Sequence, residues 1–161
     1  MKKIWKIIIG LLAIIGVLGI AAGAYIFYII KNVDYKYTGE ELFAAVNKYR
    51  TSQGIPTIKL DPTLCDNLVE RYWAIKEPGN AHKKYEEWLK SEGISDNPKY
   101  GVIGEMYVVD ISTPNNAINF WLGSPGHKST LEIKELAYGC AYANDGTGVV
   151  IMATPKENTA R

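Results

Sequence analysis

Three side chains in this sequence are suited to chemistry: His82, Glu105 and His127. They include both histidines of the 161-residue chain, one in "GNAHKKYEEW" and one in "FWLGSPGHKS". Glu105 lies in the β-prone apolar run "YGVIGEMYVVDI", where a carboxylate is costly to bury without a partner. Two imidazoles and a carboxylate form a common zinc ligand set. The same three groups also suit acid–base chemistry near neutral pH.

The residue types and spacing leave other interpretations open. A histidine in a loop is usually solvated, and Glu105 can accept backbone N–H bonds at a strand bend. Alternatively, the polar cluster ties a helical layer to a sheet. Ser124 lies three residues before His127, which makes it a candidate nucleophile if the two side chains reach each other. A residue of a helix-terminal turn is the simpler interpretation of Ser124.

The N-terminus predicts a membrane anchor. The basic tip "MKKIWK" precedes an uncharged run from Ile7 to Ile30, and a helix of that length spans about 36 Å, more than a hydrocarbon core of about 30 Å. A cleaved signal peptide is the alternative, because Ala22-Gly23-Ala24 offers a small-x-small site. The apolar run continues through that site, which favours the anchor. The positive-inside rule then places the C-terminal part outside the cell.

Charge and cysteine content restrict the possible partners. Without the three lysines of the tip, the 18 basic residues fall to 15, against 17 acidic ones. Because no basic stripe is present, nucleic acid is not expected as a partner. The two cysteines, Cys65 and Cys140, lie in the part predicted to be external, where a disulfide is permitted. Two buried thiols are the equal alternative, since the sequence does not give the Cα separation.

Helix signals dominate the first half of the remaining chain. We expect helices that begin at the Thr38–Glu41 capping box and at Asp61-Pro62, a third that follows His82, and a fourth that begins at Thr113-Pro114. Glycines at 54, 93 and 123 mark helix ends.

Strand signals come later. "YGVIGEMYVVDI" predicts one strand, and "LAYGCAYA" and "TGVVIMAT" around "NDG" predict a closing hairpin. This order indicates an α+β domain with helices on a small antiparallel sheet. The expected organisation is an anchor at 1–30, a linker at 31–37, a domain at 38–155 and a tail at 156–161.

Several stretches, taken in order, resemble the CAP superfamily, also called SCP-like, in its bacterial extracellular branch. They are "LFAAVNKYRTSQGIPTIKLDPTLC", "AH" at 81–82, "GE" at 104–105, "FWLGSPGHKS" and "YGCAYANDGTGVVIMA". The resemblance covers roughly residues 38–153. It implies an α-β-α sandwich, which agrees with the class expected from the element order.

The resemblance also implies a site. The family's cavity usually holds two histidines and two glutamates, and in some members it binds a divalent cation. His82, Glu105 and His127 match three of these four residues, so they are the expected ligands of a zinc-like ion. Ser124 stands where many eukaryotic members have the second glutamate. Met106 and Thr130 replace asparagines that are frequent in the family. The expected site therefore has fewer polar side chains than the most complete sites of the family.

We therefore expect a single-pass membrane protein with an external CAP domain on the bacterial cell surface. Its cavity, formed by His82, Glu105 and His127 with Ser124 nearby, is expected to bind a peptide, glycan or lipid. The alternative is a metal-assisted or Ser–His hydrolase that acts outside the membrane. A purely structural polar cluster is the third possibility.

Overall fold

The structure is a computed structural model that describes residues 15–28, 37–66, 68–77 and 84–157. The chain forms two compact units, Met1–Asp34 and Tyr35–Arg161, and each is described here by itself. In the first unit, residues 15–28 are helical with exposed side chains. Among the described residues, no helix has the length and apolar character needed to cross a membrane. The predicted span extends past the described helix at both ends, and the structure does not confirm it.

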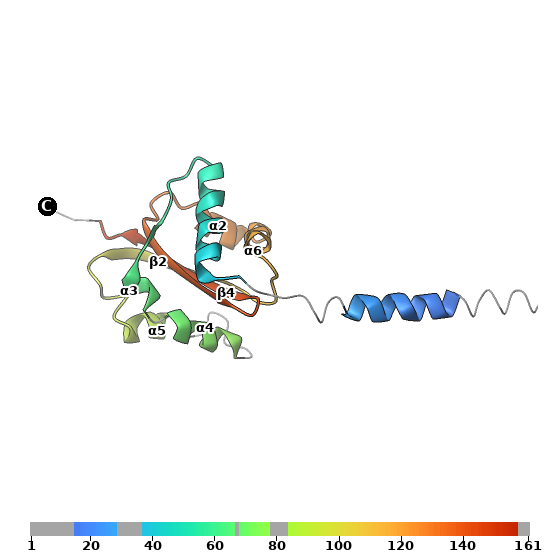
Figure 1. Cartoon of the computed structure of the whole chain (residues 1–161). Helices are drawn as coiled ribbons and strands as arrows, with labels where there is room; N and C mark the ends of the chain where they lie inside the picture. Colours follow the sequence, from blue (N-terminus) through green and yellow to red (C-terminus); the bar gives the residue numbers. More distant parts are fainter. Residues whose placement is uncertain (1–14, 29–36, 67, 78–83, 158–161) are drawn as a thin grey trace, which may run out of the picture. The chain divides into compact units, whose positions relative to one another are not determined.

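The second unit is a three-layer arrangement of helices and one sheet (Figure 1). Its elements in chain order are α2 (Gly39–Ser52), β1 (Lys59–Leu60), α3 (Pro62–Cys65), α4 (Leu68–Lys76), α5 (Tyr85–Ser91), β2 (Tyr100–Val108), α6 (Pro114–Leu122), α7 (Pro125–Leu131), β3 (Tyr138–Asn144) and β4 (Thr147–Pro155).

The sheet has the strand order β1-β3-β4-β2. β4 pairs antiparallel with both β3 and β2, whereas β1 pairs parallel with β3. Every residue of β4 from Thr147 to Ala153 is buried, because this central strand is covered on both faces. This double burial explains the unbroken apolar run "GVVIMA", which lacks the alternation of a half-exposed strand.

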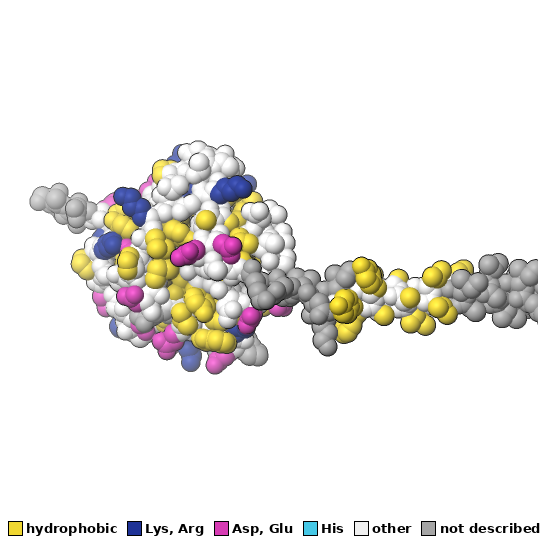
Figure 2. Space-filling view, viewed as in Figure 1, with side chains coloured by type: hydrophobic (Ala, Val, Ile, Leu, Met, Phe, Trp, Pro, Cys, Tyr) yellow, Lys and Arg dark blue, Asp and Glu magenta, His cyan; other side chains and the backbone are white. Residues whose placement is uncertain are grey.

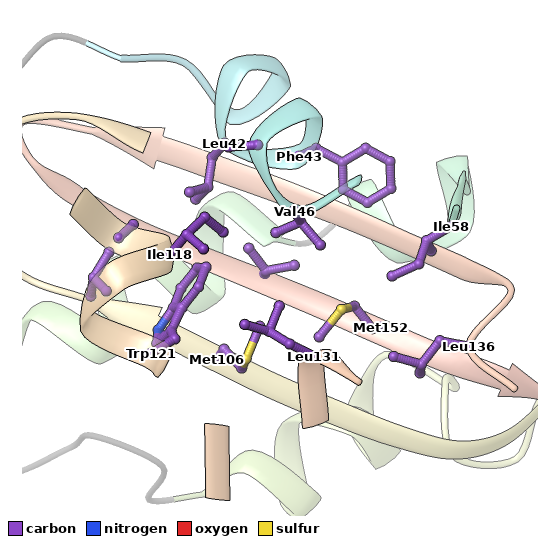
Figure 3. Close-up of a cluster of buried hydrophobic side chains, with 14 of the residues drawn as sticks. Leu42, Phe43, Val46, Ile58, Met106, Ile118, Trp121, Leu131, Leu136 and Met152 are labelled. Carbon is purple, nitrogen blue, oxygen red and sulfur yellow. The ribbon is translucent and has the colours of Figure 1, made fainter. Parts of the chain in front are cut away.

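Each face of the sheet has its own hydrophobic core. α2 and α6 cover one face, where Leu42, Val46, Met106 and Trp121 are fully buried (Figure 3). The indole N–H of Trp121 donates to the Tyr107 carbonyl at 3.0 Å. On the opposite face, α3, α4 and α5 supply a second core. The predicted α-β-α sandwich is confirmed.

The predicted helix starts are present. Thr38 and Glu41 form a complete capping box, and Asp61 and Thr113 accept backbone N–H bonds at the starts of α3 and α6. The segment after Asp61 forms two helices, α3 and α4, where one was predicted. Residue 67, between the two helices, lies outside the described residues.

Two residues of the "VNKYR" motif anchor α2 to the chain around it. The Asn47 side chain bonds both the N–H and the carbonyl of Ile58, at 2.7 and 3.0 Å. The buried Arg50 guanidinium donates to the carbonyls of Pro56, Leu131 and Ile133. This motif therefore has a structural role, holding the α2–β1 connector and the segment after α7 against α2.

A disulfide joins Cys65 at the end of α3 to Cys140 in β3. It closes a loop over a sequence separation of 75 residues. The structure thus decides between the two interpretations of the cysteines in favour of the bridge. Loops of this length give a disulfide a large effect on the entropy of the unfolded chain.

Candidate functional site

Glu105 lies in the middle of β2, and its partner is a buried arginine from α4. Arg71 donates from Nε to Oε2 at 2.5 Å and from Nη2 to Oε1 at 2.8 Å. Both side chains are only 2% exposed. Two parallel N–H···O bonds to one carboxylate are the strongest geometry available to this kind of pair. The expected partner of the buried acid therefore exists, and it is a guanidinium.

Two aromatic rings of α5 flank this ion pair. The Arg71 guanidinium carbon lies 5.5 Å from the centroid of the Tyr85 ring and 5.9 Å from that of Trp88. The two rings stack on each other, with centroids 6.2 Å apart and planes 24° apart. Burial, together with the negative charge of Glu105, raises the pKa of Tyr85. The tyrosine therefore stays neutral at physiological pH and serves as a wall of the site.

A cavity of about 370 Å³ opens between α4 and α5, beside the ion pair. Arg71 and Trp88 reach it from within, and Glu70, Glu87 and Glu92 stand around it. Figure 2 shows acidic side chains along the lower part of the face in view, where α4 and α5 lie. Because Arg71 is neutralised by Glu105, Lys84 is the main counter-charge in the cavity lining.

His127 lies on α7, in a position that differs from the prediction. "SPG" was expected to form a rigid turn that aims the histidine. Instead, Ser124 precedes the helix as its N-cap residue and Pro125 is its first residue. Proline is favoured at that position because its missing N–H would have no helical partner. His127 is therefore a half-buried residue in the first turn of a helix.

α7 packs against the strand that carries Glu105. A Cβ atom placed on Gly104 would lie 3.2 Å from Cγ2 of Thr130 on α7. Because side chains alternate along a strand, this contact is on the face of β2 opposite to Glu105. Within the described ranges, the Ser124 hydroxyl makes no hydrogen bond, with the helix N–H groups or otherwise. A Ser–His pair therefore has no support from the Ser124 side chain.

Only two of the three predicted metal ligands, Glu105 and His127, lie in the described part of the chain. His82 lies outside the described residues, and the structure gives no geometry for it. In the described ranges, no group of three His, Cys, Asp or Glu side chains is arranged to hold a metal ion. The Glu105 carboxylate is engaged through both oxygens by a cationic guanidinium, which opposes a second cation beside it. These residues do not fit a divalent cation at Glu105.

Arg71 is the functional residue that the sequence analysis missed. Its signal was present, because Arg71 lies three residues after Leu68 and seven after Leu64, on the apolar face of the predicted helix. A charged residue on such a face requires a buried partner. Tyr85 and Trp88 lie in the helix expected after His82, but they were not identified from the sequence as the walls of a site.

Comparison with known proteins gives a family. The model of the CAP family, described as the cysteine-rich secretory protein family, matches residues 43–154. A search of curated proteins finds no match.

Solved structures with the same fold come from three bacteria. An extracellular protein containing an SCP domain from Bacillus anthracis matches with a TM-score of 0.59 and 16% identity, over 71% of this chain and 39% of its own. A cysteine-rich secretory protein from Staphylococcus aureus gives 0.57 and 16%, over 72% and 38%. An outer surface protein from Borrelia burgdorferi gives 0.56 and 18%, over 71% and 89%. The match thus spans less than two fifths of the first two proteins.

Proposed function

The chain belongs to the cysteine-rich secretory protein (CAP) family, and on this premise we propose that it is an extracellular, membrane-tethered binding module. Its recognition surface is the cavity between α4 and α5, beside Arg71 and Glu105. The disulfide supports an oxidising location. So do the names of two structural neighbours, an extracellular protein and an outer surface protein. The tether is the apolar stretch 7–30, of which residues 15–28 are helical.

The observation that carries this proposal is the two-point pairing of Glu105 with Arg71. A metal hydrolase needs a carboxylate that accepts a cation or a proton from water. Glu105 instead accepts two hydrogen bonds from a fixed positive charge. The pair makes the floor of the cavity rigid and close to electrically neutral, while Trp88 supplies an apolar wall. Rigid aromatic and arginine side chains are the groups that most often dominate binding energy at protein surfaces.

The alternative, a metal-assisted or Ser–His hydrolase, is not proposed. The hydroxyl of Ser124 makes no hydrogen bond within the described part of the chain, and a nucleophile requires an adjacent base that is itself oriented. The carboxylate that could orient such a base is held by Arg71.

Site-specific photo-crosslinking in the native bacterium tests the proposal. A photoreactive amino acid replaces Glu87, which lines the cavity, or Lys90, which lies on the same helix but outside the cavity lining. We expect a discrete covalent adduct on the full-length protein from position 87 and none from position 90. Adducts of equal yield at both positions, or none at either, would contradict a recognition surface at this cavity.

A further inference from the structure

We propose a second binding site, for an oligosaccharide, in the groove between α2 and α6. This groove is on the face of the sheet opposite to the Arg71–Glu105 site, so the inference goes beyond the proposed function and does not depend on it. The groove has a volume of about 360 Å³. Ala45 and Ile118, both buried, form its floor.

The groove walls consist of polar side chains in two helical rows. Lys48 and Ser52 are four residues apart on α2, and Asn115 and Asn119 are four residues apart on α6. Residues with this spacing lie on one face of a helix, one above the other. Since α2 and α6 pack together, the two rows face a common space.

The two asparagines are available to a ligand. Both are exposed, and in the described part of the chain neither amide side chain makes a hydrogen bond. Each amide offers one acceptor and two donors in a plane. By contrast, Asn116 on the same helix donates to the Ser112 hydroxyl at 3.1 Å. The groove therefore presents two unused amides one helical turn apart.

Tyr49 adds an aromatic surface to the lining of the groove. Its hydroxyl donates to Glu132 at 2.7 Å, which fixes the ring. Burial, with the hydrogen bond to Glu132, raises the pKa of Tyr49 to about 12, so the ring remains uncharged. The Ser52 hydroxyl donates to the Tyr49 carbonyl at 2.6 Å and accepts from the Gln53 amide at 3.2 Å, which leaves it one acceptor lone pair.

This combination matches a sugar better than other ligand classes. Neighbouring hydroxyl groups of a sugar donate and accept together, as amide side chains do, and the C–H face of the ring packs on an aromatic ring. A peptide is less suited, because the lining has no deep apolar pocket for an anchor side chain. A nucleic acid is not the expected ligand, because Lys48 is the one cation among the described residues of the lining.

Titration of the full-length protein with defined oligosaccharides tests the inference. The protein is held in micelles of a detergent without a sugar head group. The probes are tetra-N-acetylchitotetraose and cellotetraose, which share β-1,4 linkages but differ in their acetamido groups. We expect saturable binding of at least one probe, with backbone amide NMR shifts confined to α2 and α6. The probe that binds tells whether acetamido groups are part of what is recognised.

Matched variants give the decisive comparison. Asn115→Ala/Asn119→Ala should weaken binding at least about tenfold, because each lost hydrogen bond costs roughly a fivefold change in affinity. Asn116→Ala, which removes an amide from the same helix outside the groove, should leave the affinity unchanged. These exposed positions tolerate alanine in a helix, so folding is preserved in both. Failure of both probes to bind, or equal affinity in the two variants, overturns the oligosaccharide site.

Discussion

At the scale of single residues, the partner of Glu105 determines what the site can do. The sequence correctly predicted that a carboxylate inside an apolar strand needs a partner, but it favoured histidines. The partner is Arg71. Its place on the apolar face of α4 indicates that it is buried, but the sequence does not say which acid it meets across the packed layers. Beside histidines alone, the same carboxylate could bind a cation. Paired with arginine, it forms a rigid cavity floor that carries little net charge.

Removing one member of this pair is expected to cost more than removing both. Arg71→Met should lower the free energy of unfolding by about 3 kcal/mol or more, because it leaves an unpaired carboxylate buried. Arg71→Met/Glu105→Met should recover most of that loss. Urea denaturation of the wild type, both single variants and the double variant gives the coupling energy. A cost below about 1 kcal/mol for Arg71→Met would contradict the buried pair.

Asp61 gives the protein an acid-dependent contribution to stability. Burial alone would raise the pKa of Asp61, but the hydrogen bond and charge of Lys99, with the Thr63 N–H, hold it below its usual value. A carboxyl with a lowered folded pKa stabilises the fold above its unfolded pKa of about 3.9, and this contribution is lost as the pH falls through the folded value.

Asp61→Asn tests this contribution, since asparagine keeps the helix cap but not the charge. We expect the melting temperature of the wild type to fall more steeply than that of the variant as the pH is lowered from about 5 to about 2. Parallel curves for the two proteins would show that the Asp61 charge does not stabilise the fold.

At the scale of elements, the sequence predicted what local chemistry controls. The capping box at Thr38, the proline after Thr113 and the turn at "NDG" all specify ends of elements, and the structure has them. For the "SPG" segment, local chemistry was not sufficient to predict the structure. The same residues start a turn or cap a helix, and whether α7 forms depends on packing of Leu131 into the core.

Tertiary packing requires a glycine at the first position of α2, residue 39. A Cβ atom on Gly39 would lie 2.9 Å from the carbonyl carbon of Ala141 in β3 and clash with its oxygen. Gly39→Ala should therefore destabilise the fold by about 1–3 kcal/mol, although alanine is the better helix former.

Gly126 is the matched control, since it lies in the first turn of α7 with open space around it. Gly126→Ala should be neutral or stabilise by up to about 1 kcal/mol. Thermal unfolding of both variants measures the difference. If the two substitutions have equal effects, α2 does not approach β3 as closely as described.

At the scale of the whole molecule, the sheet separates two surfaces of different chemistry. The face covered by α4 and α5 has an acidic cavity with an aromatic wall, and the face covered by α2 and α6 has a polar groove. The family and the layer order were predictable from the sequence, because the order of the motifs indicates the family and the pattern of apolar residues indicates the layers. The two surfaces were not, because each depends on how two helices pack against each other, and the groove joins α2 and α6, which are distant in sequence.

The most direct test of the account is whether a divalent cation stabilises the protein. Full-length wild type and Glu105→Gln are melted after treatment with a chelator and again with excess zinc. The account predicts no zinc-dependent stabilisation that requires Glu105, because Arg71 holds this carboxylate. Zinc at about a hundred times its dissociation constant would add roughly 2.7 kcal/mol to a true site. A stabilisation of that size in the wild type, absent from Glu105→Gln, would contradict the account and restore a cation site.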